Sequence, residues 1–387
     1  MRTEQLTHFL DSLDQKGIAG TAFAVMHEGK LVCEHYHGMA DRAAGKPIGP
    51  DTIYRLFSMT KVFTNVALMQ LYEKGAFILS DPLSNYLPEF ADMQVVHHKP
   101  NGQVELRPAK HPIRIADIMG MTAGMTYAGA DDYASQVLTE NLRKLEEEKP
   151  NYTTRDYAKA VAASPLAYEP GTHWRYSTAH EVVGALIEVL SGERFSEYVD
   201  RHICRPLGLR DTFFHAPKEL LDARLAHLYR TEGPDTGAEI TERDKLYSME
   251  SKMDRGGAGM CSTLADYLRF ADTLTQGGTS TDGVRILGSE TLRIMRTNRL
   301  TPEQLPDLDW PFYIGYGYGL GVRVLLHPEI AVGGNAGEFG WDGAVGTIVF
   351  MDCDKKLTAV FMEQAAPNHK AYILPRLRNL MYAGLNG

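Results

Sequence analysis

The chain has 387 residues, of which 44% are hydrophobic, and a formal net charge of -9 at pH 7. This length is enough to bury one large core or two closely packed lobes. Because the acidic residues are spread along the chain and no basic cluster occurs, neither nucleic acid nor an anionic membrane surface is an expected partner.

The N-terminal segment predicts an amphipathic helix, with Leu6, Phe9, Leu10 and Leu13 at helical spacing and Gly17 at its end. The segment lacks the apolar core of a signal peptide, and no apolar run in the chain reaches transmembrane length. The four cysteines show neither metal nor redox spacing, which is typical of reduced thiols. Together these features predict a cytoplasmic protein.

A β-hairpin is predicted next, because residues 21–26 and 31–36 alternate like strands around a short turn that contains glycine. His35 and His37 lie on the same face of the second predicted strand, where two imidazoles offer metal ligands. The sequence shows no third ligand near them, so a polar outer face is the favoured interpretation.

The segment from Phe57 to Glu73 is rich in apolar residues on all its faces and predicts a helix that is buried on every side. Its first turn carries Ser58 and Lys61, which at a spacing of i and i+3 share one face. Burial and the helix N-terminus both disfavour an ammonium, so a neutral Lys61 would act as a base toward a Ser58 nucleophile. Taken alone, the segment also fits a capping serine and a lysine that reaches the surface.

The middle of the chain has the texture of helices, turns and long loops. Helices are predicted at 138–148, 155–163, 183–190, 264–274 and 290–296. Strands return at 318–326, 344–351 and 357–363, followed by a helix at 370–382. Strands at both ends of the chain predict an α+β fold with one antiparallel sheet, flanked by the N- and C-terminal helices. Residues 1–82 and 310–387 would form this α/β lobe, and residues 83–309 an inserted helical lobe.

Two further segments carry candidate chemistry. Tyr176 lies just before a helix that is predicted to begin near Ala179, where a tyrosine commonly serves in packing. Residues 337–344 are rich in glycine, so their backbone can approach another segment closely. The N–H of Ala344 would then be an oxyanion donor, although a simple glycine-rich turn explains the same residues.

The order Ser-x-x-Lys, Tyr-Ser-Thr and Trp-Asp-Gly resembles that of the serine β-lactamase and penicillin-binding-protein superfamily. The chain is similar to class C β-lactamases and, more closely, to family VIII carboxylesterases. Four segments resemble family segments at family spacing: 54–61, 115–124, 170–177 and 256–263. The resemblance covers nearly the whole chain, and it implies an antiparallel α/β lobe, a helical lobe and an active site in the cleft between them.

The resemblance also implies a role for each matching residue. Ser58 would be the acylated nucleophile, Lys61 the adjacent base and Tyr176 the second proton relay. The N–H groups of Ser58 and Ala344 would form the oxyanion hole. The chemistry of this superfamily needs no metal and no organic cofactor.

Departures from the lactamase pattern predict a different substrate. Thr178 stands where lactamases place an Asn that binds the acylamino arm, and Trp341-Asp342-Gly343 replaces a motif that begins with Lys. An Asp at this place repels a carboxylate, and Trp341 offers apolar area to an ester. Tyr316 and Tyr318 are expected to line the cleft.

We therefore expect a serine carboxylesterase that acts on short-chain or aryl esters, with a small-molecule ester as its partner. Two alternatives remain at this point. One is a β-lactamase, D-amino-acid peptidase or acyltransferase that uses the same acyl-enzyme. The other is a catalytically silent binding protein on this fold.

Overall fold

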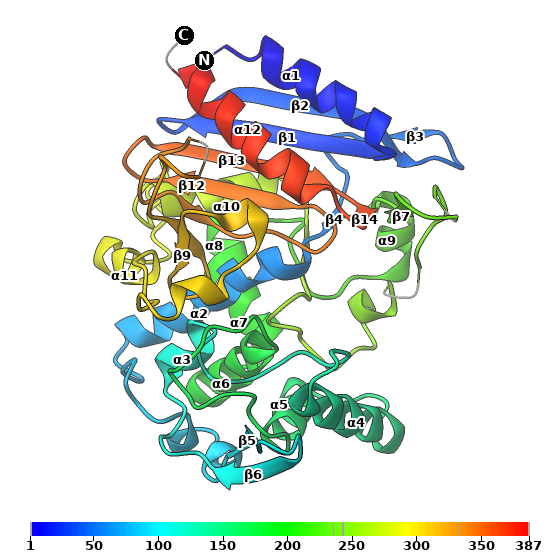
Figure 1. Cartoon of the computed structure of the whole chain (residues 1–387). Coiled ribbons are helices and arrows are strands. Elements are labelled where there is room, and N and C mark those ends of the chain that lie inside the picture. The colour runs from blue at the N-terminus through cyan, green and yellow to red at the C-terminus, as the bar shows by residue number, and fades with distance from the viewer. Residues whose placement is uncertain (1, 235, 242–243, 332, 386–387) are drawn as a thin grey trace.

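The computed structural model describes residues 2–234, 236–241, 244–331 and 333–385 (Figure 1). An eight-stranded sheet has the order β3-β2-β1-β13-β12-β11-β10-β9, and every neighbouring pair is antiparallel. Its strands are β1 Gly20–His27, β2 Lys30–Asp41, β3 Lys46–Pro47, β9 Tyr316–Tyr318, β10 Arg323–Leu325, β11 Phe339–Gly340, β12 Ile348–Asp352 and β13 Leu357–Glu363. This sheet, with helices around it, confirms the predicted α+β fold class.

The centre of the sheet joins the two ends of the chain. Strand β1 pairs with β13 from Thr21↔Glu363 to His27↔Leu357. Helices α1 (Glu4–Asp11) and α12 (Lys370–Leu385) cover one face of the sheet, and α10 (Leu264–Thr275) packs against the other (Figure 1). Because both faces are covered, β13 is buried along its whole length, and its residues are apolar except Thr358 and Glu363.

The remaining helices lie mostly on the far side of α2 (Thr60–Glu73), away from the sheet (Figure 1). They are α3 Ile115–Met119, α4 Tyr133–Glu148, α5 Thr154–Ala162, α6 Ala179–Ser191, α7 Phe195–Val199, α8 Arg205–Leu207, α9 Lys218–Arg224 and α11 Ser289–Met295. The helix predicted at 138–148 begins earlier, because the Asp132 side chain accepts a hydrogen bond from the Ser135 N–H and caps it there. Helix α10 was expected in the helical lobe, but it packs against β1 and β13.

Three short strand pairs complete the fold: β5 Gln94–His98 with β6 Val104–Pro108, β4 Tyr54–Arg55 with β8 Cys261–Ser262, and β7 Tyr229–Arg230 with β14 Ala365–Ala366. Two strand predictions were wrong in extent. The strand expected at 318–326 is broken at Gly321. Its φ of +75° lets the chain reverse direction there, so β9 and β10 pair as a tight hairpin. The strand expected from residue 344 begins only at Ile348, because the Gly343 N–H bonds to the Thr347 carbonyl and closes a turn.

Helix α2 is the innermost helix, as its composition predicts. Its residues from Thr60 to Met69 are all buried, polar ones included. A 3₁₀ turn at Phe57–Met59 leads into it, and Phe57 adopts the left-handed region with a φ of +45°, which is strained for a bulky residue. Within the described ranges, none of the helices combines the length and apolarity that a membrane span requires.

Candidate active site

The structure brings Ser58 and Lys61 into direct contact. Ser58 lies on the 3₁₀ turn, and Lys61 extends from the first turn of α2, where its side chain is fully buried. Its Nζ donates hydrogen bonds to the Ser58 Oγ at 3.1 Å and to the Gly257 carbonyl at 2.7 Å. An amine is thereby placed against the hydroxyl of a candidate nucleophile, which is the contact that activation of a serine requires.

Burial lowers the pKa of Lys61 to about 7, and the negative charges of Glu181 and Asp342 oppose that change. Glu181 is itself buried on α6, and burial raises the pKa of its carboxyl, against the pull of Arg255 and Lys61. A pKa near 7 leaves a large fraction of Lys61 neutral at physiological pH. Lys61 therefore has both the position and the proton affinity of a general base.

Tyr176 lies beside the same pair. The Lys61 Nζ is 4.7 Å from the centre of the Tyr176 ring, and the Trp341 Nε1 donates a hydrogen bond to the Tyr176 hydroxyl at 3.2 Å. Burial raises the pKa of Tyr176 above its usual value, although hydrogen bonds from Ser58, Trp341 and Tyr127 lower it. The hydroxyl thus keeps its proton at neutral pH, which suits a proton donor better than a base.

Tyr127 is a member of the cluster that the sequence analysis missed. It lies in the loop after α3, and its hydroxyl accepts a hydrogen bond from the Lys61 Nζ at 3.4 Å while it also bonds to Tyr176. Glu181 was missed as well. A lone tyrosine in a loop has no recognisable spacing, whereas a glutamate in the first turn of the largely apolar helix α6 was a usable signal.

The third segment reaches the nucleophile through a glycine. A Cβ on Gly343 would lie 2.5 Å from the Leu56 carbonyl oxygen, so only glycine lets this turn close against the residues before Ser58. Ala344 follows in the same turn, and its carbonyl accepts a hydrogen bond from Asn368 at 2.6 Å. Among the described residues, neither the Ser58 N–H nor the Ala344 N–H donates a hydrogen bond, so both remain free for an oxyanion.

Asp342 is not placed as the sequence analysis expected. Its side chain is 1% exposed and forms an ion pair with Lys370 of α12, and it also accepts a hydrogen bond from Tyr313. Burial raises the pKa of Asp342, and Lys370 counteracts the rise. A carboxylate so paired and buried anchors the turn that carries Ala344. It does not face the substrate, so the expected repulsion of anionic substrates by Asp342 is wrong.

Two other expected substrate contacts are internal. The Thr178 hydroxyl is buried and donates to the Thr126 carbonyl at 2.9 Å. The buried Tyr316 hydroxyl donates to Glu338 at 2.7 Å and accepts from Arg378 of α12 at 2.5 Å. Both hydroxyls are therefore occupied by structural hydrogen bonds and do not face the substrate. The expectation was wrong because the sequence pattern does not reveal which face of a strand or loop is covered.

An aromatic cluster surrounds the Tyr176 hydroxyl. Ring centroids lie 5.4 Å apart for Tyr176 and Trp341, 5.3 Å for Tyr176 and Trp310, and 5.1 Å for Tyr318 and Trp341. Tyr318 and Trp341 are both buried, with Tyr318 packed edge-on against Trp341, so neither offers the open cleft surface that the sequence analysis expected. Tyr176 and Trp310 are the partly exposed rings of the cluster. Aromatic rings therefore line the Tyr176 side of the candidate site.

The chain is similar to known proteins over most of its length. The family model described as Beta-lactamase matches residues 6–380. The chain is 31% identical over 358 residues to Protein Rv1367c of Mycobacterium tuberculosis, covering 91% of this chain and 87% of that protein. It is 27% identical over 390 residues to Esterase EstB of Burkholderia gladioli, covering 92% and 89%. Among solved structures, EstCE1, a hydrolase with promiscuous acyltransferase activity, superposes with a TM-score of 0.78 at 22% identity, covering 99% and 98% of the two chains.

Proposed function

Because the chain belongs to the Beta-lactamase family, we propose that it is a serine carboxylesterase that hydrolyses short-chain or aryl esters through an acyl-enzyme on Ser58. The observation that carries the proposal is the 3.1 Å contact between the Lys61 Nζ and the Ser58 Oγ. The lowered pKa of Lys61, about 7, supplies the base that this contact needs at neutral pH.

In the proposed acylation, the Ser58 proton passes to the neutral Lys61 while the Ser58 Oγ bonds to the ester carbonyl carbon. The N–H groups of Ser58 and Ala344 stabilise the oxyanion. When the carbon–oxygen bond to the alcohol breaks, the Tyr176 hydroxyl protonates the leaving oxygen. The Tyr127 hydroxyl contacts both Lys61 and Tyr176, so the proton held by Lys61 returns to Tyr176 through the Tyr127 hydroxyl.

Deacylation repeats these steps with water. Lys61 takes a proton from the attacking water, a carbon–oxygen bond forms to the acyl carbon, and the Ser58 Oγ leaves with a proton from Tyr176. If an alcohol replaces the water, the same steps transfer the acyl group. The apolar rings around Tyr176 favour an apolar alcohol there, and EstCE1 is described as having promiscuous acyltransferase activity. Acyl transfer is therefore the second candidate function.

The aromatic cluster also supports the ester class of substrate. Its partly exposed rings, Tyr176 and Trp310, offer apolar contact area. Lys370, a cation next to the third segment, is already paired with Asp342. A neutral ester needs no cation, whereas a β-lactam carboxylate gains from one. We therefore expect kcat/KM for nitrophenyl butyrate to exceed that for a cephalosporin or a D-alanyl peptide by orders of magnitude.

The deciding experiment uses Ser58→Ala with nitrophenyl butyrate and a phosphonate ester. The variant should fold like the wild type and lose esterase activity, and the phosphonate should add once to the wild type, at Ser58. Ser289→Ala on α11 is the matched control, because Ser289 is exposed and stands at a helix start. An adduct on another serine, or full activity in Ser58→Ala, would refute the proposal.

A further inference from the structure

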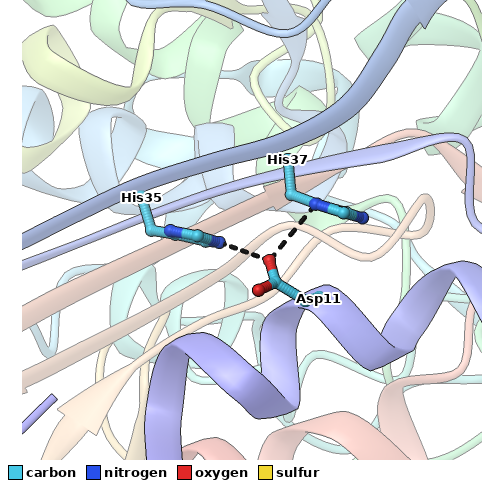
Figure 2. A group of neighbouring side chains, drawn as sticks. All are labelled: Asp11, His35 and His37. Atoms are coloured by element: carbon cyan, nitrogen blue, oxygen red, sulfur yellow. Dashed lines mark hydrogen bonds and ion pairs between the residues drawn. The ribbon is translucent and has the colours of Figure 1, made fainter. Parts of the chain in front are cut away.

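Outside the candidate active site, three metal-binding side chains converge between α1 and β2 (Figure 2). Asp11 is the last residue of α1, and His35 and His37 project from one face of β2. The Asp11 Oδ1 lies 2.7 Å from the His35 Nε2 and 3.2 Å from the His37 Nδ1. The two imidazole rings are parallel within 6°, and the three ligand atoms lie within 4.8 Å of one another.

We propose that Asp11, His35 and His37 form a binding site for a divalent transition metal of the zinc type. Two imidazole nitrogens and one carboxylate oxygen suit Zn²⁺, Co²⁺ or Ni²⁺. Ca²⁺ and Mg²⁺ fit poorly, because they take six or more oxygen ligands. Three protein ligands leave the fourth tetrahedral position to water.

Two of the three ligand-atom spacings are close to what a zinc ion requires, and the two histidine nitrogens lie within 4.8 Å of each other. Metal–ligand bonds of about 2.0 Å in a tetrahedron put neighbouring ligand atoms about 3.3 Å apart. The His37 contact of 3.2 Å already has this length, and the His35 contact of 2.7 Å needs to open by a fraction of an ångström. All three side chains are partly exposed, at 47%, 22% and 33%, so an ion reaches them without unfolding of the chain.

Without metal, the His35 Nε2 forms a hydrogen bond with the Asp11 Oδ1, and the His37 Nδ1 lies within ion-pair distance of the same oxygen, with a ring proton of each histidine facing Asp11. A metal ion would replace those protons and bond to the lone pairs of the two nitrogens and the oxygen. The ion would then fasten the C-terminal end of α1 to β2. That face of the sheet is the one covered by α1 and α12, opposite α10, so the site acts on stability and leaves ester chemistry unaffected (Figure 1).

The test is calorimetric titration of the untagged full chain with ZnCl₂, accompanied by Co²⁺ absorption spectra and thermal unfolding. The wild type should bind one ion at this site and gain thermal stability. The double variant His35→Gln/His37→Gln, which loses two of three ligands, should weaken Zn²⁺ binding by at least about 100-fold and abolish the thermal shift. Asp11→Asn, an exposed change that leaves the strand intact, should weaken binding by at least about tenfold.

His97→Gln/His98→Gln is the matched control, since these two histidines are exposed neighbours on another hairpin. It should bind Zn²⁺ like the wild type, and nitrophenyl butyrate hydrolysis by the wild type should be the same with and without Zn²⁺. The proposal is overturned if the His35/His37 double variant binds Zn²⁺ as tightly as the wild type. It is equally overturned if the His97/His98 variant loses the same binding.

Discussion

Glu181 sets how readily Lys61 gives up its proton. A Cβ built on Gly257 would lie 2.8 Å from the Glu181 Oε1 and 3.4 Å from the Lys61 Nζ, so the missing side chain at Gly257 lets the carboxyl and the amine approach across one backbone segment. Burial drives the pKa of Lys61 down, and the charge of Glu181 limits the fall. The value near 7 is the balance between these two effects.

This balance predicts the pH dependence of the esterase. Lys61 must be neutral to accept the Ser58 proton, so kcat/KM for nitrophenyl butyrate should rise with pH through about 7, the pKa of Lys61. Glu181→Gln removes the negative charge that favours the ammonium, so the pKa falls and the rise should move to lower pH. The pH–rate profile measures both.

Glu188→Gln is the control for this prediction, because Glu188 lies on the same helix and hydrogen-bonds to the Phe195 N–H, away from Lys61. Its profile should match that of the wild type. A Glu181→Gln profile that stays in place, or moves to higher pH, would contradict the electrostatic role of Glu181.

The sequence predicted single site residues where a reactive side chain belongs to a motif with a defined spacing. Ser58, Lys61 and Tyr176 were predicted to act together because each belongs to an ordered motif, and the structure brings their side chains together. Tyr127 joins them from a loop that no motif marks. The environment of Asp342 was misjudged because its partner Lys370 lies on a distant helix.

Helix α12 anchors the turn at Asp342–Ala344, which carries the proposed oxyanion donor. Its first residue, Lys370, pairs with Asp342, two residues before Ala344, and Asn368 just ahead of the helix bonds to the Ala344 carbonyl. The position of the Ala344 N–H thus depends on a helix that touches no substrate.

Lys370→Met tests this dependence. Removal of one partner from a buried ion pair leaves an unpaired carboxylate and typically costs about 3–5 kcal/mol of stability. We expect a loss of this order in urea unfolding, and a fall in kcat of up to about 1,000-fold, the effect of losing one oxyanion donor. Arg376→Met, an exposed change on the same helix, should do neither.

The double variant Lys370→Met/Asp342→Asn removes the unpaired charge and should recover part of the stability. Asp342→Asn alone should slow esters and cephalosporins alike, because Asp342 supports the backbone of the turn. A selective gain on carboxylate-bearing substrates would instead restore the substrate-facing role that the sequence suggested.

Helices and strands were predictable from the sequence where they are long and periodic, but the residues at which they begin and end were not. The buried helix α2 and the central strand β13 were found from their apolar runs. The hairpin of β5 and β6 was missed because only Val95 in it is buried, so its sequence shows no alternation. Local hydrogen bonds at caps and turns, which composition does not reveal, set the ends of α4 and β12.

At the scale of the whole molecule, the two chain ends meet. The Arg2 N–H donates to the Gly384 carbonyl at 3.1 Å, and α1 packs against α12 (Figure 1). The sequence predicted that strands from both ends of the chain form one sheet. It could not supply the strand order, because pairing between distant segments leaves no local pattern.

The meeting of the ends predicts that a circular permutant will fold. A short Gly-Ser linker would join the present ends, and new ends would open between Asn101 and Gly102, at the exposed tip of the β5–β6 hairpin. Esterase kcat/KM should remain within a few-fold of the wild type. A permutant opened between Lys355 and Lys356 cuts the central β12–β13 hairpin and should unfold more readily in urea. Equal stability of the two permutants would show that the central pairing contributes little.

The pairing of β1 with β13 also bears on when the proposed active site can form during synthesis. Synthesis proceeds from the N-terminus, so Ser58 and Lys61 leave the ribosome early, whereas β13 and Lys370 are among the last segments to appear. Until then β1 lacks a central neighbour and the turn that carries Ala344 lacks its anchor. A growing chain should therefore hold Ser58 before the proposed oxyanion site is complete, and a chain truncated before β13 is expected to lack the proposed esterase activity.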